Sequence, residues 1–179
     1  MKPWERIEPT VTTKVGWRTI TTKNFKLPDG RTAAFDLLHP DGQVFVNVIA
    51  LTSDNKVVIA RQFRPGPEAI YDELPGGFVD EGESPEIAVL RELKEETGYV
   101  PTKMTLLGSY QKDTYMNATW YGFLAQGCIR QSDATPEGVE DIEVDSITIT
   151  QLIENAKNGK MTDQQTVLMA YDTLKELED

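Results

Sequence analysis

Short apolar runs, several of them rich in Val and Ile, alternate with polar turn sequences over the first third of the chain. Two β-prone runs flank the turn sequence PDG within residues 17–38, and this arrangement predicts an antiparallel hairpin. Two further runs, QVFVNVIALT at residues 43–52 and KVVIARQF at residues 56–63, are separated only by SDN. They predict two neighbouring strands that are buried in a sheet.

Two segments beside these runs have the composition of turns and loops. HPDGQ at residues 39–43 predicts a turn that carries His39, and RPGPEAIYDELPGG at residues 64–77 predicts a loop rich in Pro and Gly. Later in the chain, MTLLGSYQK, TWYGFLAQG and IEVDSITI read as strands, and TITQLIENAKNG and DQQTVLMAYDTLKELE read as amphipathic helices. Strands mixed with one internal and two C-terminal helices predict a layered α/β domain.

The clearest helix of the chain is the internal one, between residues 84 and 97. Ser84 is a suitable N-cap, Pro85 suits the first helical position, and Gly98 supplies the stop. At 100° per residue, one arc of this helix is apolar and is expected to pack against the domain; it comprises Ile87, Val89, Leu90 and Leu93.

A second arc of the same helix is acidic and comprises Glu92, Glu95 and Glu96. Like charges three or four positions apart cost roughly a few tenths of a kcal/mol per pair, so an offsetting partner is expected. A hard divalent cation would be such a partner, because Mg²⁺ prefers carboxylate oxygens and commonly bridges them to substrate phosphates. The alternative is a solvated acidic face with Arg91 and Lys94 nearby.

Composition and charge narrow the possible functions. The chain has 179 residues and a net charge of −11, which argues against general binding to nucleic acid or anionic lipid. No apolar run approaches the ~20 residues of a membrane span, and the N-terminus lacks the apolar segment of a signal peptide, so we expect a cytoplasmic protein. The single Cys128 reads as a small buried residue, and one histidine is too few for a histidine-based metal site or a Ser-His-Asp triad.

The residues around the acidic helix resemble a known motif. Gly77, Glu83, the pair Arg91-Glu92, and then Leu93, Glu95, Glu96, Gly98 and Tyr99 follow the spacing of the Nudix box, GX5EX7REUXEEXGU, where U is apolar. Only the last U position departs slightly, because Tyr99 is aromatic. So many constrained positions at fixed spacing make this motif far more specific than a lone glycine-rich loop.

The resemblance implies a fold, a cofactor and a set of roles. The fold would be the Nudix fold, an α/β/α sandwich with a mixed sheet, preceded here by an N-terminal antiparallel β-hairpin. Glu92, Glu95 and Glu96 would ligate Mg²⁺ or Mn²⁺, and Gly77 would let the loop backbone approach the metal and the substrate. Arg91 would orient the acids, while Glu83 would hold Arg91 or assist a metal. Hydrolysis of a phosphoanhydride by this site needs no histidine, because metal ions can neutralise the phosphates and activate water.

Sequence outside the box resembles one branch of the family, the ADP-ribose pyrophosphatases. The branch carries R-Q-[YF]-R before an E-L-P-[AG]-G loop, and this chain has Arg61-Gln62-Phe63-Arg64 and Glu73-Leu74-Pro75-Gly76-Gly77. The C-terminal GKMTD at residues 159–163 resembles the G-x-[IM]-x-D run of the same branch. The resemblance implies that Arg64 contacts a substrate phosphate and that Glu73 belongs to the substrate site. Alternatively, Arg64 is a solvated arginine at a strand end.

In this branch the general base resembles an acidic residue on the loop before the late strand. Glu140 is the preferred candidate, because VEDIEV matches the E-x-I-x-V pattern at the start of that strand, and Glu137 and Asp141 are the alternatives. A loop that closes over bound substrate is a reasonable location for a base. The competing interpretation is that these acids only keep the surface solvated.

The N-terminal residues 1–40 are predicted to form a β extension to a Nudix domain at residues 41–179. In this branch such an extension commonly pairs between subunits and stacks aromatic residues on adenine, so the resemblance implies a homodimer in which Trp4 and Trp17 contact the base. The alternative for both tryptophans is packing in a core or a dimer interface.

The expected activity is Mg²⁺-dependent hydrolysis of a nucleoside diphosphate sugar, with ADP-ribose yielding AMP and ribose 5-phosphate as the best single substrate. One departure keeps other substrates open: QKDTYMNATWYGF lacks the proline of the branch's Ser-Pro-Gly turn, so Tyr115, Asn117 or Trp120 can shape a different pocket. The alternatives are a Nudix pyrophosphatase for another derivative such as GDP-mannose, and a sensor that binds a nucleotide metabolite without turnover.

Overall fold

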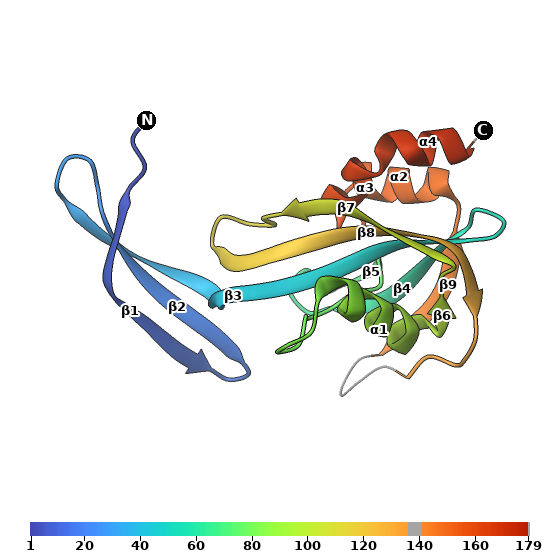
Figure 1. The fold of residues 1–179 in the computed structure, drawn as a ribbon, viewed down its shortest axis with the longest axis horizontal. Helices are drawn as coiled ribbons and strands as arrows, with labels where there is room; N and C mark the ends of the chain where they lie inside the picture. Colours follow the sequence, from blue (N-terminus) through green and yellow to red (C-terminus); the bar gives the residue numbers. More distant parts are fainter. Residues whose placement is uncertain (136–140, 179) are drawn as a thin grey trace. The chain divides into compact units, whose positions relative to one another are not determined.

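The structure, a computed structural model, describes residues 1–135 and 141–178 and contains two compact units. The N-terminal unit comprises Met1–Val44 and Gln111–Thr119, and the second unit, named the sandwich unit, comprises Phe45–Tyr110 and Trp120–Asp179. Figure 1 traces the helices and strands along the chain. Dimerisation and base binding by residues 1–40 stay predictions.

The N-terminal unit is built on three antiparallel strands. β2 (Arg18–Lys26) pairs with the first part of β3 (Thr32–Thr52), so the hairpin predicted around PDG is confirmed. β1 (Glu5–Val15) pairs with the other edge of β2, and the sequence did not predict this strand. Most β1 side chains are exposed, so the strand lacks the alternation of apolar residues that marks a half-buried strand.

The predicted turn at HPDGQ is wrong, because β3 continues through it. His39 and Gly42 have left-handed backbone, with φ values of 76° and 80°, but the chain does not reverse. The carbonyl of His39 accepts a 2.9 Å hydrogen bond from Thr21 Oγ1, and Leu38 N donates to Tyr115 O at 2.9 Å. These contacts hold the strand on both sides, and the turn signal produces only a local distortion.

The sheet of the sandwich unit is formed around β3 and β4 (Val57–Arg64). These two strands pair antiparallel, as predicted, and β4 also pairs with β5 (Ala69–Glu73) and β9 (Ile142–Ile147). β8 (Met116–Arg130) pairs with β3, with β6 (Tyr99–Val100) and with β7 (Lys103–Tyr110).

The segment 64–77, predicted to be a loop, therefore contains a strand. β5 forms because the end of β4 offers it a pairing edge, with Arg64 opposite Ala69 and Ala60 opposite Glu73. Such pairing depends on the neighbouring strand and leaves little trace in the local composition.

The apolar residues of β3 divide between the two faces of the sheet. Val46, Val48 and Ala50 face one way and pack in a core with Ala88, Val89 and Leu93 of α1 (Pro85–Thr97). Residues of the opposite parity, Ile49 and Leu51, pack in a second core with the C-terminal helices α2 (Ile149–Lys157), α3 (Gln164–Met169) and α4 (Tyr171–Glu178). Helices therefore cover both faces of the sheet in this unit, which confirms the predicted α/β/α sandwich (Figure 1).

Two predictions about the helices need correction. Ile87 and Leu90 of α1 are 60% and 42% exposed, so the buried face of α1 is not the predicted apolar arc. It is rotated toward Glu96, which is only 5% exposed, because this part of the helix packs against the loop after β5. The single helix predicted for residues 163–178 is divided at Ala170 into α3 and α4. No helix within residues 1–135 and 141–178 has the length and apolar character needed to cross a bilayer.

Candidate active site

Local signals at both ends of α1 fix where its acidic side chains lie. Ser84 Oγ accepts a hydrogen bond from Ile87 N, Pro85 occupies the first turn, and Gly98 ends the helix with a left-handed φ of 76°. The Gly98 amide donates to Lys94 O at 2.8 Å. The predicted start and stop of the helix are therefore confirmed, and they set the register that directs Arg91 and the glutamates toward the loop after β5.

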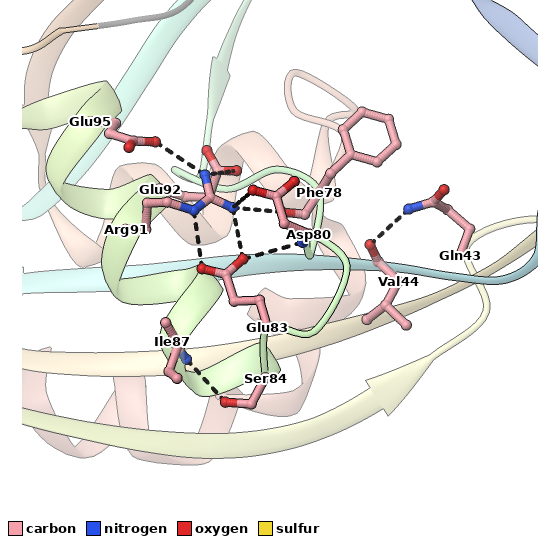
Figure 2. Close-up of polar contacts among 10 residues, drawn as sticks. All are labelled: Gln43, Val44, Phe78, Asp80, Glu83, Ser84, Ile87, Arg91, Glu92 and Glu95. Carbon is pink, nitrogen blue, oxygen red and sulfur yellow. Dashed lines mark hydrogen bonds and ion pairs between the residues drawn. The ribbon is translucent and has the colours of Figure 1, made fainter.

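Arg91 lies at the centre of a set of ionic hydrogen bonds. Its Nε and Nη2 donate to the two carboxylate oxygens of Glu83 at 3.1 and 3.0 Å, and its Nη1 donates to Glu92 Oε1 at 2.9 Å and Glu95 Oε2 at 3.1 Å. Nη2 also donates to the carbonyl of Phe78 at 3.0 Å. Figure 2 shows the guanidinium between Glu83 on one side and the α1 acids on the other. Arg91 thus contacts the acids that the sequence expected it to orient.

These contacts shift the protonation equilibria of the pair. Hydrogen bonds to Glu83, together with the charge of Glu92 and hydrogen bonds to Glu92 and Glu95, raise the pKa of Arg91 above its usual value despite partial burial. The hydrogen bonds from Arg91 lower the pKa of Glu83 below its usual value. Of the two roles considered for Glu83, its bidentate contact matches that of holding Arg91.

Glu96 is held by the backbone of the loop. Its Oε2 accepts a 2.8 Å hydrogen bond from the amide of Gly76, and the residue is 5% exposed. The loop itself is attached to β3, because Val46 N donates to Gly77 O at 2.9 Å and Val48 N donates to Pro75 O at 3.0 Å. Glu96 is therefore ordered by the same loop that follows Glu73.

Gly77 permits a close approach between this loop and Glu92. A Cβ built on Gly77 would lie 2.5 Å from Glu92 Oε1 and 2.9 Å from Oε2, well inside van der Waals contact. Any larger residue would therefore displace this carboxylate. The backbone at Gly77 and the carboxylate of Glu92 are thus adjacent, as the sequence motif implied.

Glu92, Glu95 and Glu96, which we name the glutamate cluster, have the chemistry of a site for a hard cation. Glu92 and Glu95 contact the same nitrogen of Arg91, so their oxygens lie close together. Gly77 leaves a space beside the Glu92 carboxylate that a Cβ would fill. Within residues 1–135 and 141–178, no three His, Cys, Asp or Glu side chains are grouped closely enough to hold a metal as they stand. In this conformation Arg91 and Gly76 N engage the carboxylates instead, and the donor set fits Mg²⁺ or Mn²⁺.

The predicted substrate residues Arg64 and Glu73 are in direct contact. Arg64 Nε donates to Glu73 Oε2 at 2.6 Å, and Nη2 forms an ion pair with the same oxygen. The side chain of Arg64 is 45% exposed, whereas that of Glu73 is 2% exposed. Arg64 is thus accessible to a ligand, and Glu73 lies behind it.

The two predicted base-stacking residues have different surroundings in the N-terminal unit. Trp4 packs with Phe35 and Phe25, with ring centroids 5.7 and 6.4 Å away, and is 44% exposed. Trp17, in the turn between β1 and β2, is 73% exposed, and the Arg18 guanidinium lies 4.4 Å above its ring. Trp17 therefore has the more accessible aromatic face.

Of the three candidate pocket residues in segment 111–123, which lacks the proline of the branch pattern, two have structural contacts. Asn117 accepts from Lys23 Nζ at 2.6 Å and donates to Asp41 at 2.8 Å, within the N-terminal unit. Trp120 is 7% exposed and stacks on Phe45 in the sandwich unit, with centroids 4.5 Å apart. Tyr115 is 60% exposed. Of the three side chains, only that of Tyr115 is largely exposed.

The candidates for the general base lie mostly beyond the described part of the chain. Glu137 and Glu140 fall within residues 136–140, which are outside the described residues. Asp141 is exposed and immediately precedes β9.

A buried polar network near the loop was not predicted. Asn47 Nδ2 donates to Tyr110 Oη at 2.9 Å and to Asp163 Oδ1 at 3.2 Å, and Thr166 Oγ1 donates to Asn47 Oδ1 at 2.6 Å. Burial raises the pKa of Tyr110, and the nearby Asp163 acts in the same direction. The sequence signal of this polar network was Asn47, the one polar residue of the run VFVNVIAL. The network holds in place the part of β3 to which the backbone of Pro75–Gly77 is hydrogen-bonded.

Comparison with known proteins places these observations in a family. A model of the NUDIX domain matches residues 43–169. The chain is 30% identical over 145 residues to the methanol dehydrogenase activator of Bacillus methanolicus, covering 80% of this chain and 77% of that one. It is 29% identical over 157 residues to the ADP-ribose pyrophosphatase of Bacillus subtilis, covering 86% and 84% of the two chains.

A solved structure also resembles the whole fold. The crystal structure of an ADP compounds hydrolase superposes with a TM-score of 0.78, covering 98% of this chain and 96% of that chain. The sequence identity is 19%, so this likeness supports the fold alone.

Proposed function

The chain belongs to the Nudix family and is a pyrophosphatase, and we propose that its substrate is the nucleoside diphosphate sugar ADP-ribose, which it cleaves to AMP and ribose 5-phosphate. One observation carries this proposal. The glutamate cluster, Arg91 and the Gly76–Gly77 backbone meet within the sandwich unit, in the part of the chain that matches the NUDIX domain.

Hydrolases of this family need a divalent metal ion, and we propose Mg²⁺, with Mn²⁺ as a substitute. Glu92, Glu95 and Glu96 would hold it, beside the backbone of Gly77. A bound ion would supply charge neutralisation for the diphosphate and activation of the attacking water. Arg91 Nη1 contacts both Glu92 and Glu95, so one oxygen of each already lies beside the same nitrogen, and metal binding would require the three carboxylates to move closer together.

The protein groups would divide the remaining tasks. Glu83 fixes Arg91 from one side, and Arg91 keeps Glu92 and Glu95 directed to one place. Arg64 would bind a substrate phosphate, for which a guanidinium is suited because its N–H groups match two phosphate oxygens. Glu140 is proposed to accept the proton of the water that attacks one phosphorus atom while the bridging P–O bond breaks.

The name of the Bacillus subtilis relative and the ADP-ribose branch motifs support an adenosine diphosphate substrate. We propose that the adenine stacks on Trp17, whose ring is the more exposed of the two candidates; Trp4, at the opposite end of β1, is the alternative stacking residue. A homodimer formed through residues 1–40 is proposed on the sequence resemblance alone, and a cytoplasmic location is proposed because the sequence has no apolar run long enough to span a membrane.

A hydrolase for a different nucleoside diphosphate derivative, such as GDP-mannose, is the first alternative, since residues 111–123 lack the proline of the branch pattern. A sensor that binds without turnover is the second, and the complete set of box acids argues against it.

A substrate panel tests these possibilities together. The protein is incubated with Mg²⁺ and with ADP-ribose, GDP-mannose, ADP-glucose, NADH or diadenosine polyphosphates, and nucleoside monophosphates are separated by ion-exchange chromatography. AMP formed fastest from ADP-ribose supports the proposal. If another member of the panel is hydrolysed faster, that compound replaces ADP-ribose as the proposed substrate, and the proposed pyrophosphate hydrolysis stands. Saturable binding without any turnover would establish the sensor and refute the proposed activity.

A further inference from the structure

Glu73 is a buried carboxylate whose two oxygens have different partners. Its Oε2 accepts from Arg64 Nε at 2.6 Å and forms an ion pair with Arg64 Nη2, and its Oε1 accepts from Thr162 Oγ1 at 2.7 Å. The residue is 1% exposed. A carboxylate this deeply buried is poorly placed to touch a substrate, but both of its contacts can direct another side chain.

Thr162 reaches Glu73 from a segment that is itself firmly packed. It lies in GKMTD at residues 159–163, between Met161, which is 1% exposed in the second core, and Asp163, which accepts from Asn47. Lys160 N donates to Asn155 O at 2.9 Å, which ties the same segment to α2. The hydroxyl of Thr162 is therefore held in place by its neighbours, and it in turn restricts Glu73.

The guanidinium of Arg64 is hydrogen-bonded along one edge only, among the residues that the structure describes. Glu73 engages Nε and Nη2, while Nη1 makes no hydrogen bond or ion pair with residues 1–135 or 141–178. The side chain is 45% exposed at the end of β4. A long arginine side chain in that position would otherwise sample many rotamers, and fixing it before ligand binding lowers the entropic cost of binding.

We propose that Thr162 and Glu73 are positioning residues that hold the guanidinium of Arg64 in the orientation that receives a substrate phosphate. This inference rests on the proposed function, and it gives a role to Thr162 of the GKMTD segment. Glu73 would thus act on the substrate through Arg64, rather than by direct contact.

The test begins with Thr162→Val, which keeps the shape of the side chain and removes its donor. KM for ADP-ribose is expected to rise roughly threefold to tenfold, the loss expected for one hydrogen bond. We expect kcat to stay nearly unchanged, because Arg64 would bind the phosphate equally in the ground and transition states. Thr162→Ser, which retains the hydroxyl, should restore the wild-type KM. Thr105→Val makes the same chemical change at an exposed site on β7 and is the matched control.

A double-mutant cycle separates positioning from general destabilisation. In an Arg64→Ala background, Thr162→Val is expected to have no further effect on KM, because the group that it positions is gone. Thermal melting of each variant reports whether the fold is retained. An unchanged KM in Thr162→Val, or the same rise in KM with and without Arg64, overturns the inference. Wild-type protein that hydrolyses no member of the substrate panel refutes the proposed function as well, so the two failures are distinguishable.

Discussion

Replacing Gly77 with alanine tests the geometry around Glu92 with the smallest possible change. The substitution adds one methyl group, and the backbone of Gly77 does not require a left-handed φ, so the conformation suits alanine. The new Cβ would lie 2.5 Å from Glu92 Oε1, 2.7 Å from Cδ and 2.9 Å from Oε2. Because all three atoms belong to the end of a flexible side chain, the carboxylate can move away while the fold persists.

The size of the effect follows from these distances. Ordinary van der Waals contact begins at 3.4 Å, so the Glu92 carboxylate must move by about 0.9 Å. Mg²⁺ tolerates little deviation from octahedral geometry, with oxygen ligands at ~2.0–2.1 Å. A displacement of ~1 Å at a reacting centre can cost about 10²-fold in rate, and we expect a loss of that order in kcat/KM. The melting temperature should change little.

The assay measures AMP formation from ADP-ribose across a range of Mg²⁺ concentrations, together with thermal melting. We expect Gly77→Ala to need more Mg²⁺ for half-maximal activity, because the displaced Glu92 carboxylate coordinates the ion less well. Gly66→Ala is the matched control, since a Cβ there meets nothing within 4 Å. Wild-type activity and wild-type Mg²⁺ dependence in Gly77→Ala would refute the assignment of Glu92 to the metal site.

Four further substitutions test the metal site, the general base, the base-stacking residue and an ion pair of the N-terminal unit. Glu96→Gln should lower kcat by about two orders of magnitude while the circular dichroism spectrum is retained, and wild-type activity would remove Glu96 from the metal site. Glu140→Gln should lower kcat by ~10²–10⁴-fold with little change in KM; an unchanged kcat would transfer the base role to Glu137 or Asp141. Trp17→Ala should raise KM for ADP-ribose by the equivalent of ~1–3 kcal/mol, and an unaltered KM would end the stacking proposal. Hydrogen bonds from Lys23, Arg6 and Asn117 lower the pKa of Asp41 below its usual 3.8, so its stabilising effect is present above that pH and is lost as pH falls through the lowered pKa. The difference in melting temperature between wild type and Asp41→Asn should therefore shrink from pH 7 to pH 2, and a constant difference would contradict the charge-based explanation.

Elements with local signals were predicted well from the sequence. The start and stop of α1 depend on Ser84, Pro85 and Gly98, which act through neighbouring backbone groups. Val46–Leu51 of β3 and Val57–Ala60 of β4 are rich in β-branched residues, because both faces of these segments are buried. In both cases the information lies within a few residues of the element that it specifies.

Elements that depend on distant partners were missed or misjudged. β5 exists because the end of β4 offers a pairing edge, and β1 is an exposed strand without apolar periodicity. The apolar arc expected on α1 was wrong at Ile87 and Leu90, because the loop amide of Gly76 draws Glu96 into the buried face. Hydropathy alone does not reveal such a polar contact.

The residues of the candidate site also divide into those that a local motif identifies and those whose partners are distant in the sequence. The Nudix box names Arg91 and the glutamate cluster by fixed spacing, and their mutual contacts follow from helix geometry. The partner of Glu73 could not be found in this way, because Thr162 lies 89 positions further along the chain. The run GKMTD was visible in the sequence, but its contact with Glu73 emerges only from the folded chain.

Metal-dependent cleavage of the pyrophosphate is measured directly by ³¹P NMR of ADP-ribose incubated with the protein, in Mg²⁺ and, separately, in EDTA. We expect that in Mg²⁺ the pyrophosphate signals are replaced by the phosphomonoester signals of AMP and ribose 5-phosphate, and that in EDTA they persist. Pyrophosphate signals that persist in Mg²⁺, or that disappear equally fast in EDTA, would contradict this expectation.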